Sequence, residues 1–436
     1  LYDLSNGRRL ASAALANPQN AFGADVISRI ARASASDADR EEMQRLILNA
    51  ISSLIKTLYF RAGQEEAAKD KTTQTQTEAD NAVDCSLTAS LTGITGAWNP
   101  EDLTLLILAG NTTMMHLLAG IPAENIARAP FNPVTVKSRI LAAPELGLTK
   151  FPRTLTVLLP SVASYVGADI TAGVIALGLE KSKHDNALLI DIGTNGELVL
   201  RTADRLTACA TAAGPAFEGA NISDGMSGTG GAIDHVWITD ANIEYSVISE
   251  SENGARPVGI CGSGLIDLAA VMLTSGVIDE TGRIGADPEV LTPALRQRLT
   301  EVDGKPAFLV ADSNETEHGR AIYLTQKDIR ELQNAKGAIA AGIQLLLKRE
   351  STSAADIKII YLAGGFGQYL NVANARAIGL LPAELSGRVI AAGNTSAMGA
   401  ISALLDSSKL AAADAAAGRV HYLELSSDPE FSDLFI

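Results

Sequence analysis

One sequence pattern occurs twice in this 436-residue chain and constrains its fold more than any other feature. Residues 105–113 run Leu-Leu-Ile-Leu-Ala-Gly-Asn-Thr-Thr, and residues 388–396 run Arg-Val-Ile-Ala-Ala-Gly-Asn-Thr-Ser. In both, an apolar stretch of strand length ends in Ala-Gly-Asn-Thr before a run of small residues typical of a helix. A third strand-like stretch, at 359–363, is also followed by glycine. Such units predict an α/β fold, in which ligands bind beyond the carboxyl ends of the strands.

The spacing of these repeats indicates two related halves. Because the period is not constant, a solenoid is excluded. We expect halves at 1–185 and 186–436, with a linking helix at about 167–180 and the two Ala-Gly-Asn-Thr segments related by a pseudo-twofold rotation. Apolar residues at helical spacing from Met43 to Leu58 predict one long helix. The polar, aperiodic segment at about 63–99 predicts a mobile surface excursion.

Composition excludes several functional classes. The formal net charge is −15, which opposes binding to nucleic acid or to anionic lipid. No apolar run reaches the length of about 18 residues needed for a membrane span. The three cysteines are odd in number and widely spaced, so they build neither a disulfide framework nor a four-thiolate metal site. This usage favours a reducing, cytoplasmic setting.

The segment 187–200 predicts a β-hairpin, with a third strand at 206–212. Asn195-Gly196 is a strong hairpin signal, and Asp191 stands at the end of the first apolar run. A carboxylate beside a glycine turn suits Mg²⁺, held through water, together with phosphate. The phosphate ligands would then be Gly193, Thr194, Asn195 and Gly196. The alternative is a simple hairpin in which the aspartate stabilises the turn.

A second glycine motif follows the strand-like stretch at 359–363. Gly364, Gly365, Phe366 and Gly367 form a turn in which adjacent glycines would let a flat ring or a sugar pack on the backbone. The alternative is a tight turn that starts a helix.

The order of these motifs resembles that of the actin-like ATPases, which include sugar kinases, acetate kinase and the chaperone ATPase domain. The chain is more similar to one branch of that superfamily, the reductive activators of corrinoid proteins. That similarity includes Asp-Ile-Gly-Thr-Asn-Gly-Glu at 191–197 and Gly-Ile-Cys-Gly-Ser-Gly-Leu-Ile-Asp at 259–267. The similar blocks span nearly the whole chain, at 17–30, 110–116, 165–171, 191–197, 214–219, 259–267, 324–330 and 364–367.

This resemblance implies two actin-like (ribonuclease H-like) subdomains with a nucleotide cleft between them. It also implies ATP and Mg²⁺ as cofactors and a homodimer. The partners it implies are an electron donor and a corrinoid protein of a methyl-transfer system, whose cobalt is returned from Co(II) to Co(I). Family members usually carry an N-terminal [2Fe-2S] domain, and no cysteine cluster for one occurs here. The first phosphate hairpin of the fold would also precede Leu1, so we expect both parts to be missing.

Further candidates come from blocks that the resemblance covers. Glu218 is the expected functional acid of the glycine-dense segment 214–231, ahead of Asp224 and Asp234, with a flexible solvated loop as the alternative. Gly262, Ser263 and Gly264 follow Cys261 at an expected helix start and suggest an anion or ribose site. Cys261 itself is expected to be a packed small residue.

The segment from Thr325 predicts a capped amphipathic helix. In actin-like ATPases the corresponding helix borders the adenine, so the resemblance makes Gln333 and Lys336 candidates for ribose or base contacts. A solvated polar face is the alternative. His116, on a Met- and Leu-rich helix, is expected to be a satisfied core residue rather than a cobalt ligand.

The leading functional hypothesis is ATP-dependent reductive activation of a corrinoid protein, with this chain as the ATP-binding and partner-docking part. A small-molecule kinase and a non-catalytic interaction scaffold are the alternatives.

Overall fold

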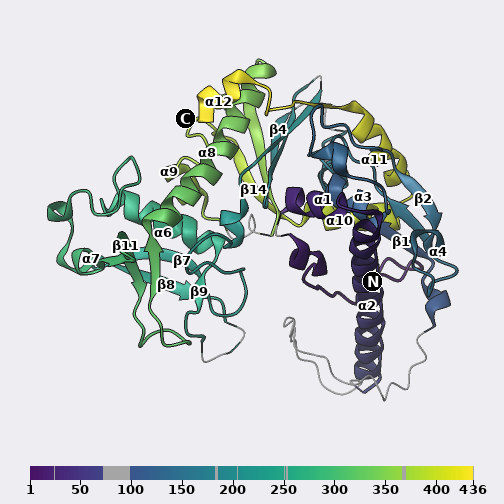
Figure 1. The fold of residues 1–436 in the computed structure, drawn as a ribbon, viewed down its shortest axis with the longest axis horizontal. Coiled ribbons are helices and arrows are strands. Elements are labelled where there is room, and N and C mark those ends of the chain that lie inside the picture. The colour runs from purple at the N-terminus through teal and green to yellow at the C-terminus, as the bar shows by residue number, and fades with distance from the viewer. Residues whose placement is uncertain are drawn as a thin grey trace. The chain divides into compact units, whose positions relative to one another are not determined.

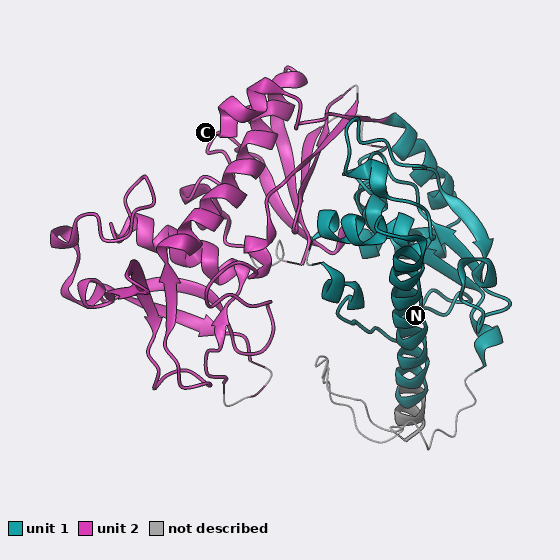
Figure 2. Cartoon of the chain, viewed as in Figure 1, with its two compact units in different colours: residues 1–180, 396–419 teal, residues 181–395, 420–436 magenta. Residues whose placement is uncertain are grey.

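The computed structural model describes residues 1–23, 25–71, 99–181, 185–203, 205–249, 251, 254–365 and 370–435. They form two compact units (Figure 2). Unit 1 comprises residues 1–180 and 396–419, and unit 2 comprises residues 181–395 and 420–436. The division near residue 180 lies close to the expected boundary, but the return of 396–419 to unit 1 differs from the expectation of a second half running to 436.

Close packing explains why residues 396–419 join unit 1. Gly399 has no side chain, and a Cβ placed there would lie 2.1 Å from the carbonyl oxygen of Ala172. Farther along, the Lys409 Nζ donates a hydrogen bond of 3.1 Å to the Ile175 carbonyl oxygen. These contacts join the helices within 396–419 to the linking helix at 167–180. The local sequence pattern of strands and helices does not reveal such long-range packing.

Unit 1 is mainly helical around a small sheet (Figure 1). Its strands follow the order β1-β3-β2, in which β1 is parallel and β2 antiparallel to β3. The elements in chain order are η1 (Pro18–Phe22), α1 (Val26–Ala33), α2 (Asp37–Lys71), η2 (Pro100–Asp102), β1 (Leu105–Leu108), α3 (Thr112–Leu118), η3 (Glu124–Ile126), β2 (Arg139–Ala142), α4 (Ala143–Leu146), β3 (Leu155–Leu158), α5 (Ala168–Ala176), α10 (Thr395–Leu405, which begins at the last residue of unit 2) and α11 (Ser408–Arg419).

The long helix α2 confirms the helical periodicity but continues through Lys71. The expected excursion at 63–99 was therefore wrong for residues 63–71. That stretch is rich in Gln, Glu, Ala and Lys, which all favour helix even where no apolar stripe marks it. Residues 72–98, including the polar run, lie outside the described residues.

Unit 2 contains a six-stranded sheet of order β14-β13-β4-β5-β6-β15 and two three-stranded sheets, β8-β7-β9 and β10-β11-β12. The meander of β4, β5 and β6 is antiparallel, which confirms the expected hairpin and third strand. The elements are β4 (Asn186–Ile192), β5 (Gly196–Arg201), β6 (Leu206–Thr211), η4 (Pro215–Glu218), β7 (Ala232–Thr239), β8 (Asn242–Val247), β9 (Gly259–Ile260), α6 (Gly262–Thr274), η5 (Pro288–Val290), α7 (Pro293–Gln297), β10 (Leu299–Val302), β11 (Lys305–Ala311), β12 (Ile322–Thr325), α8 (Gln326–Arg349), η6 (Ala354–Asp356), β13 (Ile357–Ala363), α9 (Val372–Ala377), β14 (Arg388–Gly393), β15 (Val420–Tyr422) and α12 (Pro429–Phe435).

Helix α8 packs on β5 and β6 to form much of the core of unit 2. Thr325 caps the helix by accepting from the Asp328 amide, which confirms the capping box. At the contact a Cβ on Gly196 would lie 2.8 Å from Ile339 Cγ1, and one on Gly342 would lie 2.8 Å from Leu198 Cδ1. The two glycines therefore let the helix approach the sheet closely. Within the described residues no helix is both long and apolar enough to cross a membrane.

Candidate functional site

The candidate site lies at the carboxyl end of strand β4 in unit 2. Strand β13 runs parallel to β4, and Ala363 pairs with Asp191 at the end of both strands. The next residue, Gly364, has a φ of 91°, and a Cβ there would lie 2.5 Å from the Ile192 carbonyl oxygen. Only glycine fits this position without strain. Two motifs far apart in the sequence therefore meet at one edge of the sheet.

The loop between β4 and β5 is one residue shorter than the sequence suggests, because Gly196 belongs to β5. Ile192 pairs directly with Gly196, so the loop consists of Gly193, Thr194 and Asn195. The Gly193 amide donates to the Asn195 carbonyl oxygen at 3.0 Å. Gly196, expected as part of the turn, belongs to the β5 ladder, where it makes room for Ile339 of α8.

Glu218 lies against this loop. It ends the short helix η4, which follows β6, and its Oε2 accepts a 2.8 Å hydrogen bond from the Thr194 hydroxyl. A Cβ on Gly193 would lie 3.6 Å from Glu218 Oε1. The carboxylate is exposed to solvent, so a water molecule can reach it.

The two other acids of the glycine-dense segment have structural partners. Asp224 accepts from the Tyr323 amide at 2.8 Å, and Asp234 accepts from the Ser246 hydroxyl at 2.6 Å. These bonds hold loops and strands of unit 2 together, which gives Asp224 and Asp234 a structural role. Glu218 therefore stays the preferred functional acid of this segment.

The groups at this end of β4 fit a magnesium-phosphate ligand. Carboxylate oxygens are preferred by Mg²⁺, directly or through its water shell, and glycine-rich turns expose amides to phosphate oxygens. Here the Asp191 carboxylate, the Thr194 hydroxyl and the Gly193 turn lie together, beside a Gly364 that leaves the backbone uncovered.

Gln333 and Lys336 line a hollow that opens to solvent between α6 and α8. Gln333 Nε2 donates to the Thr281 carbonyl oxygen at 3.0 Å, and its Oε1 accepts from Arg330 at 2.8 Å. Partial burial lowers the pKa of the Lys336 ammonium. Asp279, Glu280 and Gly282 also line the hollow, and apolar side chains form the rest of its wall. Its apolar members are Ala269, Leu273, Ile278, Ile329, Leu332 and Ile378.

The segment Gly262, Ser263 and Gly264 is buried at the start of α6. A Cβ on Gly264 would lie 2.2 Å from the Ile233 carbonyl oxygen, so this glycine lets α6 pack on β7. Cys261 is buried and its Sγ donates to the same carbonyl oxygen at 3.3 Å, which confirms it as a packed residue. The anion or ribose role of this segment stays a prediction. Phe366 and Gly367 lie outside the described residues.

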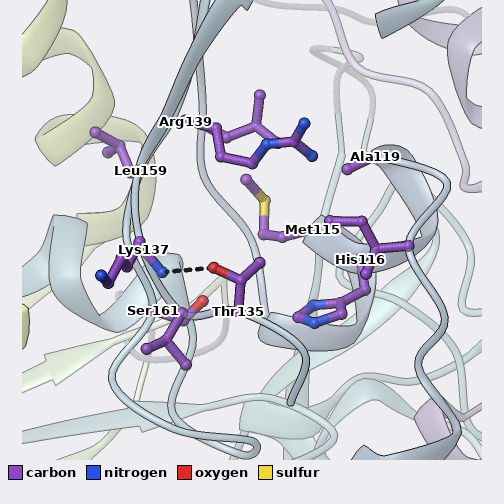
Figure 3. A pocket seen from close by; sticks show the side chains of 11 residues that line it. Met115, His116, Ala119, Thr135, Lys137, Arg139, Leu159 and Ser161 are labelled. Atoms are coloured by element: carbon purple, nitrogen blue, oxygen red, sulfur yellow. Dashed lines mark hydrogen bonds between the residues drawn. The ribbon is translucent and has the colours of Figure 1, made fainter.

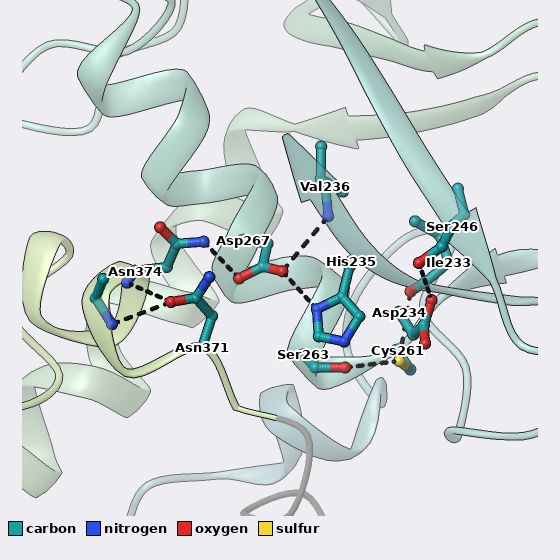
Figure 4. Close-up of polar contacts among 11 residues, drawn as sticks. Ile233, Asp234, His235, Val236, Ser246, Cys261, Ser263, Asp267, Asn371 and Asn374 are labelled. Carbon is teal, nitrogen blue, oxygen red and sulfur yellow. Dashed lines mark hydrogen bonds and ion pairs between the residues drawn. The ribbon is translucent and has the colours of Figure 1, made fainter. Parts of the chain in front are cut away.

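Asp267 is a buried carboxylate that the sequence analysis did not single out. It is 2% exposed and joins three elements of unit 2 (Figure 4). Its Oδ1 accepts from Asn374 Nδ2 of α9 at 2.6 Å, and its Oδ2 accepts from His235 Nδ1 of β7 at 2.9 Å. An aspartate inside the otherwise apolar run of α6 was the available signal, because an acid is seldom buried unless paired.

Asp169, in unit 1, is a second acid that the sequence analysis left unassigned. It lies at the start of α5, and burial raises the pKa of its carboxyl from 3.8 to about 6. The Ala168 and Asp169 amides donate to the Gly110 carbonyl oxygen at 2.9 and 3.3 Å. Asp169 therefore stands beside the first Ala-Gly-Asn-Thr turn, and strongly shifted acids are candidates for functional groups.

Comparison with known proteins gives matches over the whole length of the chain. A family model for the C-terminal domain of RACo, the ASKHA domain, matches residues 185–436, and a model for the RACo middle region matches 1–92 and 67–182. The corrinoid activation enzyme RamQ of Eubacterium limosum is 31% identical over the entire chain, which covers 67% of RamQ. The [Co(II) methylated amine-specific corrinoid protein] reductase of Methanosarcina barkeri is 26% identical over 70% of this chain and 56% of its own length.

A solved structure agrees with these relatives. The reductive activator for corrinoid, iron-sulfur protein superposes over the entire chain with a TM-score of 0.80 and 36% identity, and this chain covers 62% of it. The chain thus spans about 56 to 67% of the length of these relatives. The match confirms the expected actin-like α/β fold. The chain therefore belongs to the RACo family and comprises its middle region and its C-terminal ASKHA domain.

Proposed function

We propose that this chain is the ATP-binding and partner-docking part of an activase that returns a corrinoid protein from Co(II) to Co(I). The relatives are named as a corrinoid activation enzyme, a Co(II) corrinoid protein reductase and a reductive activator. The ASKHA match supports nucleotide binding. Because the chain spans only part of these relatives, the activity is proposed for the protein that contains it.

The observation that carries the nucleotide part is the meeting of Asp191, Thr194, Glu218 and Gly364 at the end of β4. Asp191 would orient hydrated Mg²⁺, while Thr194 and Asn195, in the turn that Gly193 and Gly196 shape, would hold phosphate oxygens. Glu218 would polarise the attacking water. Mg²⁺, when bound, supplies stabilisation of the charge that develops on the transferring phosphoryl group.

The remaining candidates complete the nucleotide site in this proposal. Gln333 and Lys336 border a hollow whose apolar wall suits a base and whose rim suits a ribose. Gly364 and Gly365, with Phe366 and Gly367, would lie under the sugar. The amides of Gly262, Ser263 and Gly264 are the weakest candidates, since the packing of Gly264 on β7 already explains that glycine.

The electron in this reaction comes from outside the chain. Reduction of Co(II) to Co(I) takes one electron, and three cysteines cannot supply the four thiolates of a [2Fe-2S] cluster. Cys209 and Cys261 are moreover buried and unpaired. The [2Fe-2S] cluster that the resemblance implies would therefore belong to a separate N-terminal domain that receives the electron from a donor. ATP would bind two conformations of the activase with different affinities. The corrinoid partner would also bind these two conformations with different affinities, so ATP would change how the partner docks. A homodimer and a cytoplasmic setting complete the proposal.

The decisive experiment measures ATP hydrolysis and Co(I) formation by the full-length protein with its corrinoid partner and a low-potential donor. Asp191→Asn is compared with Asp185→Asn, which removes a carboxylate just before the other end of the same strand. We expect Asp191→Asn to lower both rates by about a hundredfold, since metal stabilisation is worth several kcal/mol. Asp185→Asn should match the parent.

Two results would contradict the proposal. ATP turnover unchanged in Asp191→Asn would make the aspartate a turn residue only. Transfer of the γ-phosphate to a metabolite, without Co(I) formation, would favour the small-molecule kinase instead.

A further inference from the structure

Unit 1 contains a pocket that the proposed function does not use. It lies between α3 and the segment that leads into β2, and it opens to solvent (Figure 3). Its polar lining comes from His116, Thr135, Lys137, Arg139 and Ser161. None of its lining residues is acidic.

His116 contributes a buried acceptor to this pocket. The residue is 2% exposed, and its Nδ1 lies 2.8 Å from the Thr112 carbonyl oxygen. A carbonyl oxygen only accepts, so Nδ1 carries the proton. Burial lowers the pKa of His116, which keeps the ring neutral at pH 7 and leaves a lone pair on Nε2.

That lone pair has no hydrogen-bond partner among the described residues. His116 is thus a core residue, as expected, but it is not a satisfied one. Leaving a buried acceptor without a hydrogen-bond donor costs free energy of folding. A ligand with an O–H or N–H group would remove that cost at His116 Nε2.

Two cations at the pocket favour an anionic ligand. Lys137 and Arg139 are exposed, and within the part of the chain that the structure describes neither forms an ion pair. Figure 3 shows the Arg139 guanidinium on the Ala119 side of the pocket, with Thr135 and the His116 ring across from it. Thr135 Oγ1 accepts from the Lys137 amide at 3.2 Å, which leaves its own proton to donate. The chain as a whole has a net charge of −15, whereas the lining of this pocket carries two cations and no acidic residue.

We propose that this pocket binds inorganic phosphate in a protonated form. Arg139 and Lys137 would neutralise its charge, and the Thr135 and Ser161 hydroxyls would donate to its oxygens. The remaining P–O–H group would donate to His116 Nε2. This last bond makes the pocket selective, because sulfate has a similar shape and charge but carries no proton at pH 7.

The test follows the His116 ring nitrogens by NMR in protein with ¹⁵N-labelled histidine, of which the chain has five. His116→Gln assigns the signal. Inorganic phosphate is titrated against sulfate and against methyl phosphate at matched ionic strength. We expect a saturable shift of the His116 Nε2 signal with phosphate, and affinity at least about tenfold lower for sulfate and for the ester dianion, which lack the donor. No shift with phosphate, or equal affinity for sulfate, would overturn the proposal.

A pair of charge variants provides the second test. Arg139→Gln removes an exposed cation of the pocket, and Lys150→Gln removes an exposed cation of the same unit outside it. We expect Arg139→Gln to weaken phosphate binding by about tenfold or more, because charge-assisted hydrogen bonds are the strong ones. Lys150→Gln should bind like the parent. Equal weakening by both would show a general charge effect and refute the pocket.

Discussion

The Asp191 carboxylate lies 3.0 Å from the point where a side chain on Gly364 would begin. The two residues are 173 positions apart in the sequence, yet parallel pairing of β4 with β13 places them side by side. The contact ties the acid of the hairpin to the glycine turn that follows β13, and a substitution at either position tests it.

Gly364→Ala should lower stability. The residue has a φ of 91°, and the new methyl group would meet the Ile192 carbonyl oxygen at 2.5 Å. We expect unfolding free energy to fall by about 1–3 kcal/mol, measured by urea denaturation. Gly365→Ala is the matched control, because a Cβ there meets nothing within 4 Å. Equal stability of the two variants would contradict the strain argument.

Glu218→Gln should slow ATP hydrolysis without loss of nucleotide affinity. The amide can still accept from the Thr194 hydroxyl, so the loop is retained while the base is lost. General-base contributions are typically hundredfold or larger, so we expect turnover to fall by about a hundredfold. Single-turnover kinetics and an ATP titration separate the two quantities. Glu301→Gln, exposed on β10, is the control, and parental turnover in Glu218→Gln would remove Glu218 from the reaction.

Asp267→Ala should destabilise unit 2. The substitution leaves Asn374 and His235 without the carboxylate to which both donate. Removing one partner of a buried charged hydrogen-bond network typically costs about 3–5 kcal/mol. A double-mutant cycle with Asn374→Ala, followed by urea denaturation, isolates the Asp267–Asn374 bond. We expect a coupling energy of about 1–3 kcal/mol, and additive effects would show that the two side chains do not stabilise one another.

Asp169→Asn should change how stability depends on pH. The folded-state pKa of about 6 exceeds the ordinary value of 3.8, so the folded protein binds more protons between these values. The parent therefore loses stability as pH rises from about 4 to 6, on the order of 3 kcal/mol from this group.

Asparagine cannot ionise and still accepts from the Ile170 amide at this position. The unfolding free energy of Asp169→Asn relative to the parent should thus rise between pH 4 and 6 and stay constant above. A difference independent of pH, in parallel urea titrations, would show that Asp169 does not titrate in this range.

The sequence by itself determined the local elements and the chemistry available to them. The apolar run before Asp191, the hairpin, the Thr325 cap and the α8 stripe follow from short-range periodicity and capping, which need no distant contact. The motif at 191–197 likewise predicted a phosphate-type site, because its aspartate, glycines and threonine lie within seven consecutive positions.

Tertiary structure decided which distant residues meet. The approach of Asp191 to Gly364, the return of 396–419 to unit 1 and the bonds of Asp267 to Asn374 and His235 depend on strand order and helix packing. Gly196 shows the difference most clearly. Its sequence context favours a turn, but the approach of Ile339 makes glycine necessary inside β5. Local propensity is worth about 1 kcal/mol or less per residue, whereas a side chain on Gly196 would clash with buried side-chain atoms of Thr211 and Ile339, so packing overrides the local signal.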